Sequence, residues 1–138
     1  MIRDNQVSLT LDVIQGHAAG RFGILVGNVR SLLIDSNRIS LTLSGGQYLH
    51  SEGIRVFGYL GSKAIIRHNE LSGFPDRVIR VVQVSAPSQY NRVVAPDPNV
   101  YLQRLHAGPQ WLIADNLVNR AELPIDAPSC LVINNSFV

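Results

Sequence analysis

A large polar amide recurs between two hydrophobic positions in four segments of this chain. The segments are SLLIDSNRIS (31–40), KAIIRHNELS (63–72), QWLIADNLVN (110–119) and SCLVINNSFV (129–138). When they are aligned on Asn, aliphatic residues stand three and four positions before it, and an apolar residue stands two positions after it. Four matching decamers in 138 residues indicate an internal repeat, which restricts the possible folds more than composition does.

The alignment also predicts where the turns of the repeat lie. The interval between Asn69 and Asn116 is the longest, and Asn91, with Val93 two positions later, predicts a degenerate turn within it. The aligned Asn column consists of Asn37, Asn69, Asn116 and Asn135.

Each repeat has an upstream run that is rich in β-branched residues and bounded by turn-forming residues. These runs are GILVGN (23–28), GIRVFGY (53–59), VIRVVQV (78–84) and VYLQRL (100–105). Their composition predicts short strands, and no segment combines a long helical periodicity with helix caps. Several short strands in each repeat are typical of either a β-solenoid or a β-sandwich.

The Asn column favours the solenoid. Coils of a solenoid stack in register about 4.8 Å apart, so that identical residues lie directly above one another. A stacked Asn can donate its amide to the Asn of the next coil and to the turn backbone, which satisfies an otherwise costly buried amide. Asn also tolerates the left-handed backbone conformation that a sharp corner needs. We therefore predict an Asn ladder at one corner of the coil.

The same alignment predicts the hydrophobic core. Cys130 shares an apolar column with Leu32, Ala64 and Trp111, and we interpret it as a small buried hydrophobe. A nucleophilic thiol would need an exposed, electropositive setting, and a lone cysteine forms no internal disulfide. The predicted core residues are Ile24, Val26, Leu32, Ile34, Ile39, Ile54, Val56, Ile66, Leu71, Val81, Ile113, Val118 and Val132.

Together these patterns resemble the coils of right-handed parallel β-helix proteins of the pectate-lyase-like superfamily. The resemblance covers roughly residues 20–138 and implies an all-β, right-handed parallel β-helix of about five coils, with residues 1–138 as a single domain. That superfamily includes polysaccharide lyases, hydrolases, epimerases, phage tailspikes and non-catalytic modules. The resemblance therefore specifies a fold and leaves the activity open.

Members of the superfamily that cleave pectins carry clustered carboxylates on adjacent coils, with calcium-binding acids and an Arg base in the lyases. The acidic residues of this chain are scattered, and no two share a column on neighbouring coils, although a glycosidase pair must lie within roughly 5–9.5 Å. The four histidines lack zinc-site spacing. The sequence thus predicts no catalytic residue, no metal site and no cofactor.

A polar strip is the remaining candidate for a binding site. Arginine pairs with carboxylates and tyrosine can stack on sugar rings, which would suit an acidic saccharide. The alternative interpretation is that these residues form ordinary cross-coil pairs on outward-facing strand positions. The candidate residues are Arg55, Arg67, His68, Arg80, Asp115, Tyr59 and Tyr101.

Three functional hypotheses follow. The first is a small non-catalytic β-helix module that binds a ligand or partner such as an acidic saccharide. The second is a polysaccharide lyase or hydrolase, or a fragment of one. The third is a structural or assembly module of a fibre or a larger surface protein. Segments 44–52 and 85–99 are the predicted protruding loops, where solenoids carry variable function.

Composition limits the location and the partners. An apolar content of 46% is typical of globular proteins, and no run approaches the roughly 18 apolar residues of a membrane span. The net charge of +2 does not by itself indicate nucleic-acid binding. Without a secretory signal pattern at the N-terminus we expect a cytoplasmic protein, or an extracellular one if the chain is excised from a longer secreted protein.

The last decamer predicts self-association. Phe137 stands in an apolar column at the end of the final repeat, and repeat proteins generally need polar terminal repeats for solubility. We therefore expect a homodimer that is stacked through the C-terminal coils and closed by a two-fold axis. Phe137→Asp should then give monomers or insoluble protein.

Overall fold

The computed structural model describes residues 1–12, 21–27, 31–44, 51–59, 63–84, 110–121, 123–127 and 130–138. Among these residues all regular secondary structure is β, and no helix is long and apolar enough to cross a membrane. The strands are β1 Ile2–Arg3, β2 Gln6–Asp12, β3 Arg21–Gly27, β4 Ser31–Asp35, β5 Arg38–Ser44, β6 Ser51–Tyr59, β7 Lys63–Arg67, β8 Glu70–Ser72, β9 Arg77–Val84, β10 Gln110–Ala114, β11 Leu117–Val118, β12 Ile125–Asp126, β13 Leu131–Ile133 and β14 Ser136–Phe137.

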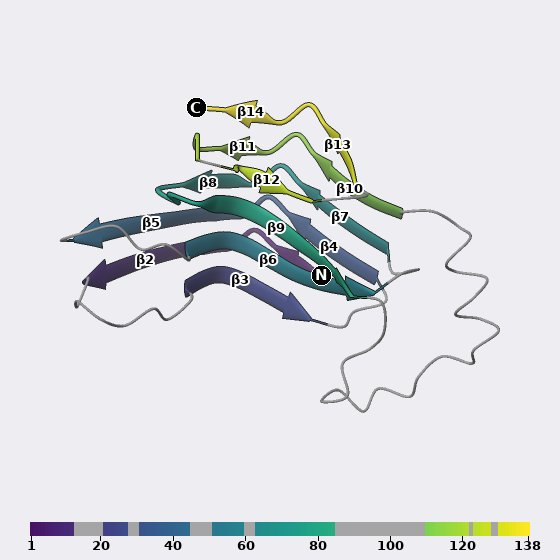
Figure 1. Cartoon of the computed structure of the whole chain (residues 1–138), viewed down its shortest axis with the longest axis horizontal. Helices are drawn as coiled ribbons and strands as arrows, with labels where there is room; N and C mark the ends of the chain where they lie inside the picture. The colour runs from purple at the N-terminus through teal and green to yellow at the C-terminus, as the bar shows by residue number, and fades with distance from the viewer. Residues whose placement is uncertain are drawn as a thin grey trace.

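The strands form three parallel sheets (Figure 1). Sheet A contains β1, β4, β7, β10 and β13 in that order, sheet B contains β2, β5, β8, β11 and β14, and sheet C contains β3, β6, β9 and β12. Each strand pairs with the equivalent strand of the neighbouring coil. The chain is therefore a parallel β-helix, as the repeat predicts.

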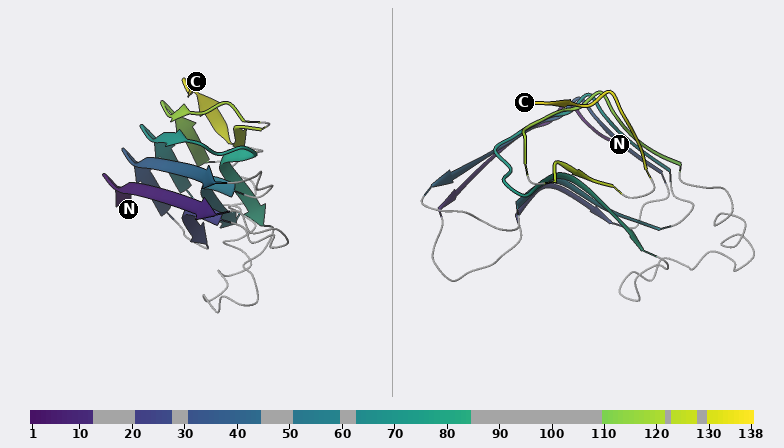
Figure 2. Two further views of the ribbon diagram at one scale, coloured as in Figure 1. Left: turned by 90° about the vertical axis from the view of Figure 1, so that its left-hand side faces the viewer. Right: turned by 45° about the horizontal axis from the view of Figure 1, so that its top comes forward.

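The coil passes from sheet A through the Asn corner to sheet B, and then to sheet C. In the right-hand view of Figure 2 the C-terminal coils lie nearest the viewer and the chain runs counter-clockwise through the three sheets, which is a right-handed coil. The apolar side chains of the three sheets fill the space between them.

The ladder begins earlier in the chain than the sequence interpretation placed it. Ile2 pairs with Ile34, and the Asn5 side chain bonds to that of Asn37 at 2.9 Å, so the N-terminal residues already form a rung. Asn5 fits the repeat, because Val7 stands two positions after it. Before it, however, the apolar run of the repeat is shortened to Met1 and Ile2, which are followed by Arg3 and Asp4. That shortened apolar run concealed the match.

The predicted degenerate turn at Asn91 is wrong as a rung of the stack. Strand β7 pairs directly with β10, from Lys63 opposite Gln110 to Arg67 opposite Ala114. The Asn69 side chain also bonds directly to Asn116 at 2.9 Å. The long interval therefore belongs to a single coil, while Asn91 itself and the predicted strand 100–105 lie outside the described residues.

The Asn ladder is present and buried. Asn37, Asn69 and Asn116 are each 1% exposed. At each junction the backbone N–H and the Nδ2 of one Asn both donate to Oδ1 of the next; for Asn69 and Asn116 the distances are 3.0 and 2.9 Å. The same Nδ2 donates to backbone carbonyls of its own turn and of the preceding coil. Every polar atom of an interior amide is thereby used.

The sequence predicts that the ladder Asn itself takes the left-handed backbone conformation at the corner, and this is wrong. The left-handed residue is the one that precedes each ladder Asn, because the Asn side chain must point into the stack while the preceding residue makes the reversal. Most of these residues belong to types that tolerate positive φ. They are Asp4, Ser36, His68, Asp115 and Asn134, with φ between 52° and 57°.

The predicted core is confirmed except at two positions. Val26 is only partly buried, and Val132 is 41% exposed because the described residues place no further coil over it. The predicted core omitted several buried residues outside the decamer columns, and three within them, namely Ala64, Trp111 and Ala114. The additional buried residues include Leu41, Phe74, Val78, Ile79 and Trp111.

Removing an interior rung should destabilise the stack. In Asn69→Leu the buried N–H of Asn37 loses its acceptor, and the carbonyl oxygens that accept from Asn69 lose a donor. We expect a loss of unfolding free energy on the order of 1–3 kcal/mol, measured by urea denaturation. Asn5→Leu, at an exposed end rung, is the matched control and should cost clearly less; equal losses would contradict an interior ladder.

The interior column makes a second prediction. Ile66 and Val132 share one column, but Ile66 is fully buried and Val132 is exposed. Ile66→Ala should cost roughly 2–5 kcal/mol of unfolding free energy, whereas Val132→Ala should cost less than about 1 kcal/mol. Thermal or urea unfolding of both variants tests this, and a value near zero for Ile66→Ala would mean that the strand faces are inverted.

Candidate functional site

The predicted polar strip consists of two separate clusters. Arg67, His68 and Asp115 lie beside the Asn corner, at the ends of β7 and β10, whereas Arg55 and Arg80 lie on β6 and β9 of sheet C. Tyr59 ends β6, but its side chain is outside the described part of the structure, as is the whole of Tyr101.

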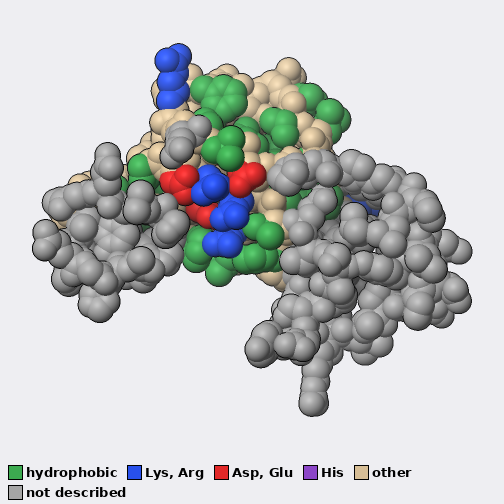
Figure 3. Space-filling view, viewed as in Figure 1, with side chains coloured by type: hydrophobic (Ala, Val, Ile, Leu, Met, Phe, Trp, Pro, Cys, Tyr) green, Lys and Arg blue, Asp and Glu red, His purple; other side chains and the backbone are tan. Residues whose placement is uncertain are grey.

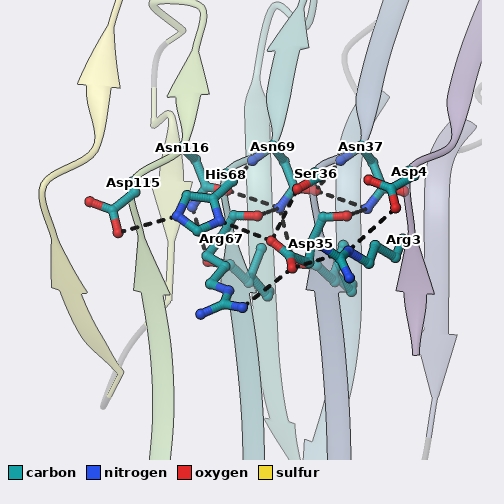
Figure 4. A network of polar contacts seen from close by, with 12 residues as sticks. Arg3, Asp4, Asp35, Ser36, Asn37, Arg67, His68, Asn69, Asp115 and Asn116 are labelled. Atoms are coloured by element: carbon teal, nitrogen blue, oxygen red, sulfur yellow. Dashed lines mark hydrogen bonds and ion pairs between the residues drawn. The ribbon is translucent and has the colours of Figure 1, made fainter.

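The corner cluster is centred on Asp35, whose side chain is only 3% exposed (Figure 4). Its carboxylate lies 3.0 Å from Nδ1 of His68, 3.4 Å from the guanidinium of Arg67 and 3.5 Å from that of Arg3. The Ser36 hydroxyl also donates to it at 3.3 Å. These residues come from three adjacent coils, because the stack places equivalent positions above one another.

His68 extends the cluster to the next coil. Its Nε2 lies 4.0 Å from the Asp115 carboxylate, so the imidazole lies between two acids. The hydrogen bond with His68 has the largest effect on the pKa of Asp35 and lowers it. Burial acts in the opposite direction, but Arg67 and Ser36 also lower the pKa, so that the net shift is downward. Ser36 donates to Asp35 and not to His68, so the arrangement differs from the serine–histidine pair of a nucleophilic site. The geometry is that of cross-coil ion pairs.

The second group, here named the sheet C cluster, consists of Glu52, Arg55, Asp76, Arg77, Arg80 and Asp126. The predicted alignment of Arg55 with Arg80 is confirmed, since the two residues pair in register, and Asp126 continues the same column. Figure 3 shows these acidic and basic side chains gathered at the middle of one face, with hydrophobic side chains above and below them.

Glu52 is the buried member of the sheet C cluster, with a side chain only 3% exposed. Its carboxylate accepts a hydrogen bond from Nη1 of Arg80 at 3.2 Å and lies 3.7 Å from Nε of Arg55. Nε of Arg80 in turn lies 3.4 Å from Asp126. Arg80 thus links two carboxylates on strands that are not neighbours.

Arg77 completes the cluster. It donates to Asp126 at 2.9 Å and to Asp76 at 2.6 Å. Burial lowers the pKa of Arg77, but its contacts with Asp126 and Asp76 outweigh burial, so the net shift is upward. Three guanidinium groups and three carboxylates therefore face one another, and their formal charges balance.

A glycine bend explains why Glu52 and Arg55 meet. The strands of sheet C bend toward sheets A and B soon after they begin (Figure 2). At this bend a Cβ on Gly53 would collide with the side chain of Leu71 and lie 2.8 Å from the carbonyl oxygen of Val78. Only glycine allows the strand to approach sheet B so closely. The outward side chains on either side of the bend then converge.

Arg55 is held differently from the other arginines. Its guanidinium carbon lies 4.7 Å from the centre of the Phe57 ring and 5.2 Å from that of Phe22, which are cation–π distances. Its Nε is buried and has no hydrogen-bond partner. Stacking, together with the 3.7 Å ion pair to Glu52, therefore holds this side chain in place.

Sequence reasoning missed most of the sheet C cluster. Glu52 was assigned to a loop (44–52), but Ser51 and Glu52 open strand β6. Phe22, which precedes the predicted strand 23–28, lies in β3. Arg77 and Asp126 show no signal in the decamer alignment, because the decamer covers sheets A and B and not sheet C.

Two further observations concern reactivity. Among the described residues no group of three or more His, Cys, Asp or Glu side chains could hold a metal ion. Burial raises the pKa of the Cys130 thiol to about 11, so the thiol stays protonated near neutral pH. Cys130 is only partly buried, whereas the sequence predicts a buried side chain, but it packs against the core. A protonated thiol is a poor nucleophile.

Comparison of the chain with protein-family models, curated proteins and solved structures found no match. The geometry of the two clusters is therefore the basis for a functional proposal.

The lowered pKa of Asp35 predicts a pH dependence of stability. A depressed carboxyl pKa contributes stability that is present above the unfolded-state value, about 4, and is lost as the pH falls through the lower folded-state value. Asp35→Asn should therefore be less stable than the parent at neutral pH and should lose less stability on acidification. Urea midpoints measured down to about pH 2.5 test this. Asp4→Asn, at an exposed acid, is the control, and parallel pH profiles for Asp35→Asn and the parent would contradict the assignment.

Proposed function

We propose that this chain is a non-catalytic β-helix module that binds an acidic saccharide on the outer face of sheet C. The observation that carries the proposal is the state of Arg55. Its side chain is fixed by two aromatic rings, and among the described residues its only ion pair is the 3.7 Å contact with Glu52. A guanidinium positioned by stacking keeps N–H donors for a ligand carboxylate.

The neighbouring groups fit the same ligand class. Arg80 lies in register with Arg55 on the next coil, about 4.8 Å away along the stack, and both guanidinium groups lie beside the Glu52 carboxylate. The side chain of Asp126 is 26% exposed, and its carboxylate can accept hydrogen bonds from sugar hydroxyl groups. A uronic acid unit carries both a carboxylate and hydroxyl donors, which matches this mixture of cations and acceptors.

We further propose that the chain belongs to the pectate-lyase-like superfamily. Coils of three parallel sheets with a buried Asn ladder at the corner between two of them support this proposal.

Binding should depend on Arg55. Isothermal titration calorimetry with oligogalacturonate and alginate oligomers should show binding, and Arg55→Gln should weaken it about 10- to 100-fold, because a charge-assisted hydrogen bond and a stacked cation are lost. Arg38→Gln is the matched control, since Arg38 pairs with Glu70 at an exposed position at the start of β5 in sheet B. Circular dichroism would confirm that both variants are folded.

Several outcomes would contradict the proposal. Absence of binding across a panel of acidic glycans would show that the ligand is not an acidic saccharide. Equally tight binding of neutral oligosaccharides would show that the site does not require acid groups on its ligand. An unchanged affinity in Arg55→Gln would place the site elsewhere. A rise in unsaturated-uronate absorbance during the titration would show a lyase and not a binding module.

A further inference from the structure

The two ring nitrogens of His68 in the corner cluster have unlike surroundings. Nδ1 lies 3.0 Å from Oδ1 of Asp35, whose side chain is only 3% exposed. Nε2 lies 4.0 Å from Oδ2 of Asp115, whose side chain is 46% exposed. One nitrogen is therefore held against a buried acid, and the other faces an acid that solvent can reach (Figure 4).

The partners of Asp35 assign the tautomer of His68. The Asp35 carboxylate lies 3.4 Å from the guanidinium of Arg67 and accepts a hydrogen bond from the Ser36 hydroxyl, and an ionised carboxylate can only accept. Nδ1 therefore carries the shared proton, and in the neutral imidazole Nε2 carries a lone pair. A carboxylate that orients an imidazole in this way is the usual outer partner of a metal-binding histidine.

Nε2 of His68 and the carboxylate of Asp115 are two electron-pair donors that face each other. Their separation of 4.0 Å is too long for a direct hydrogen bond. A zinc ion with bonds of about 2.0 Å to each ligand holds tetrahedral ligand atoms about 3.3 Å apart. Because both side chains are about half exposed, a small rotation of Asp115 brings the two atoms to that separation.

The backbone gives successive corner residues the same orientation. His68, Asp115 and Asn134 each precede a ladder Asn and have φ of 53°, 55° and 52°. The pairing of β7 with β10 and of β10 with β13 places the three residues on consecutive coils. Asn134 is exposed, so its amide oxygen can act as a further ligand, and water can complete the coordination.

We propose that His68 and Asp115 bind a divalent transition-metal ion of the zinc class between two neighbouring coils, and that Asp35 is the positioning residue for the imidazole. An imidazole nitrogen favours zinc over magnesium and calcium, which prefer oxygen ligands. The spacing of the histidines in the sequence gives no sign of this site, because its ligands come from different coils. The site is separate from the saccharide site proposed on sheet C and does not depend on it.

The ion would join the coils that flank the long interval of the chain. His68 and Asp115 directly precede Asn69 and Asn116, whose side chains form the rung across that interval. A ligand that binds only the folded chain stabilises it by mass action. Zinc should therefore raise the unfolding midpoint of the parent chain, and addition of a chelator should reverse the rise.

Isothermal titration calorimetry with zinc chloride near neutral pH tests the ligands. The parent should bind one equivalent of zinc. His68→Asn should abolish binding, because it removes the only nitrogen ligand, and Asp115→Asn should weaken binding about 10-fold or more. Asparagine tolerates the left-handed backbone of both positions. Asp4→Asn is the matched control, since it makes the same change at the equivalent corner of another coil, and it should bind like the parent.

Asp35→Asn tests the positioning role. It keeps both ligands but should weaken zinc binding about 10- to 100-fold, the usual cost of losing an outer partner of a metal-binding histidine. Nitrogen-15 spectra of the imidazole supply a readout that a purely structural role would leave unchanged. Without metal, His68 should be the Nδ1–H tautomer in the parent and a mixture of tautomers in Asp35→Asn, and zinc should shift the Nε2 signal of the parent.

Four results would overturn the proposal. A parent chain that does not bind zinc has only a water or a proton between His68 and Asp115. Unchanged binding by His68→Asn places the zinc elsewhere, and an equal loss in Asp4→Asn and Asp115→Asn shows a general effect of charge. Calcium binding as tight as zinc binding indicates a site made of oxygen ligands alone. If Asp35→Asn fails to fold, Asp115→Asn, at an exposed position, still decides the matter.

Discussion

The structure depends on one requirement, namely that a buried side-chain amide must have all of its hydrogen bonds made. An Asn in the interior of the corner would destabilise the fold if it were left without partners. It is satisfied only when another Asn lies one coil away in the same register, as Asn69 is by Asn37 and Asn116. The ladder therefore fixes the stacking of the coils and sets the register between neighbouring strands in sheets A and B.

That register explains both polar clusters. Because equivalent positions stack, Asp35 lies beside Arg67, and Arg55 lies beside Arg80. In the corner cluster the acids and bases mainly neutralise one another around a buried carboxylate. In the sheet C cluster the glycine bend at Gly53 adds a second effect, since it brings Glu52 and Arg55 together and leaves Arg55 stacked on aromatic rings. This difference is why the proposed binding site lies on sheet C.

The repeat, the fold class, the Asn ladder and most of the core follow from the amino-acid pattern alone, because they depend on a local pattern that recurs at each coil. The pairing of coils across the interval from Asn69 to Asn116 became visible only in the folded chain, because the number of residues between two rungs does not show how many coils separate them. The tertiary structure also separated Arg67 from Arg55, since a column alignment does not show on which sheet a column lies. Glu52 was missed because its burial depends on a bend set by contacts with Leu71 and Val78, which are distant in the sequence and close only in the folded coil.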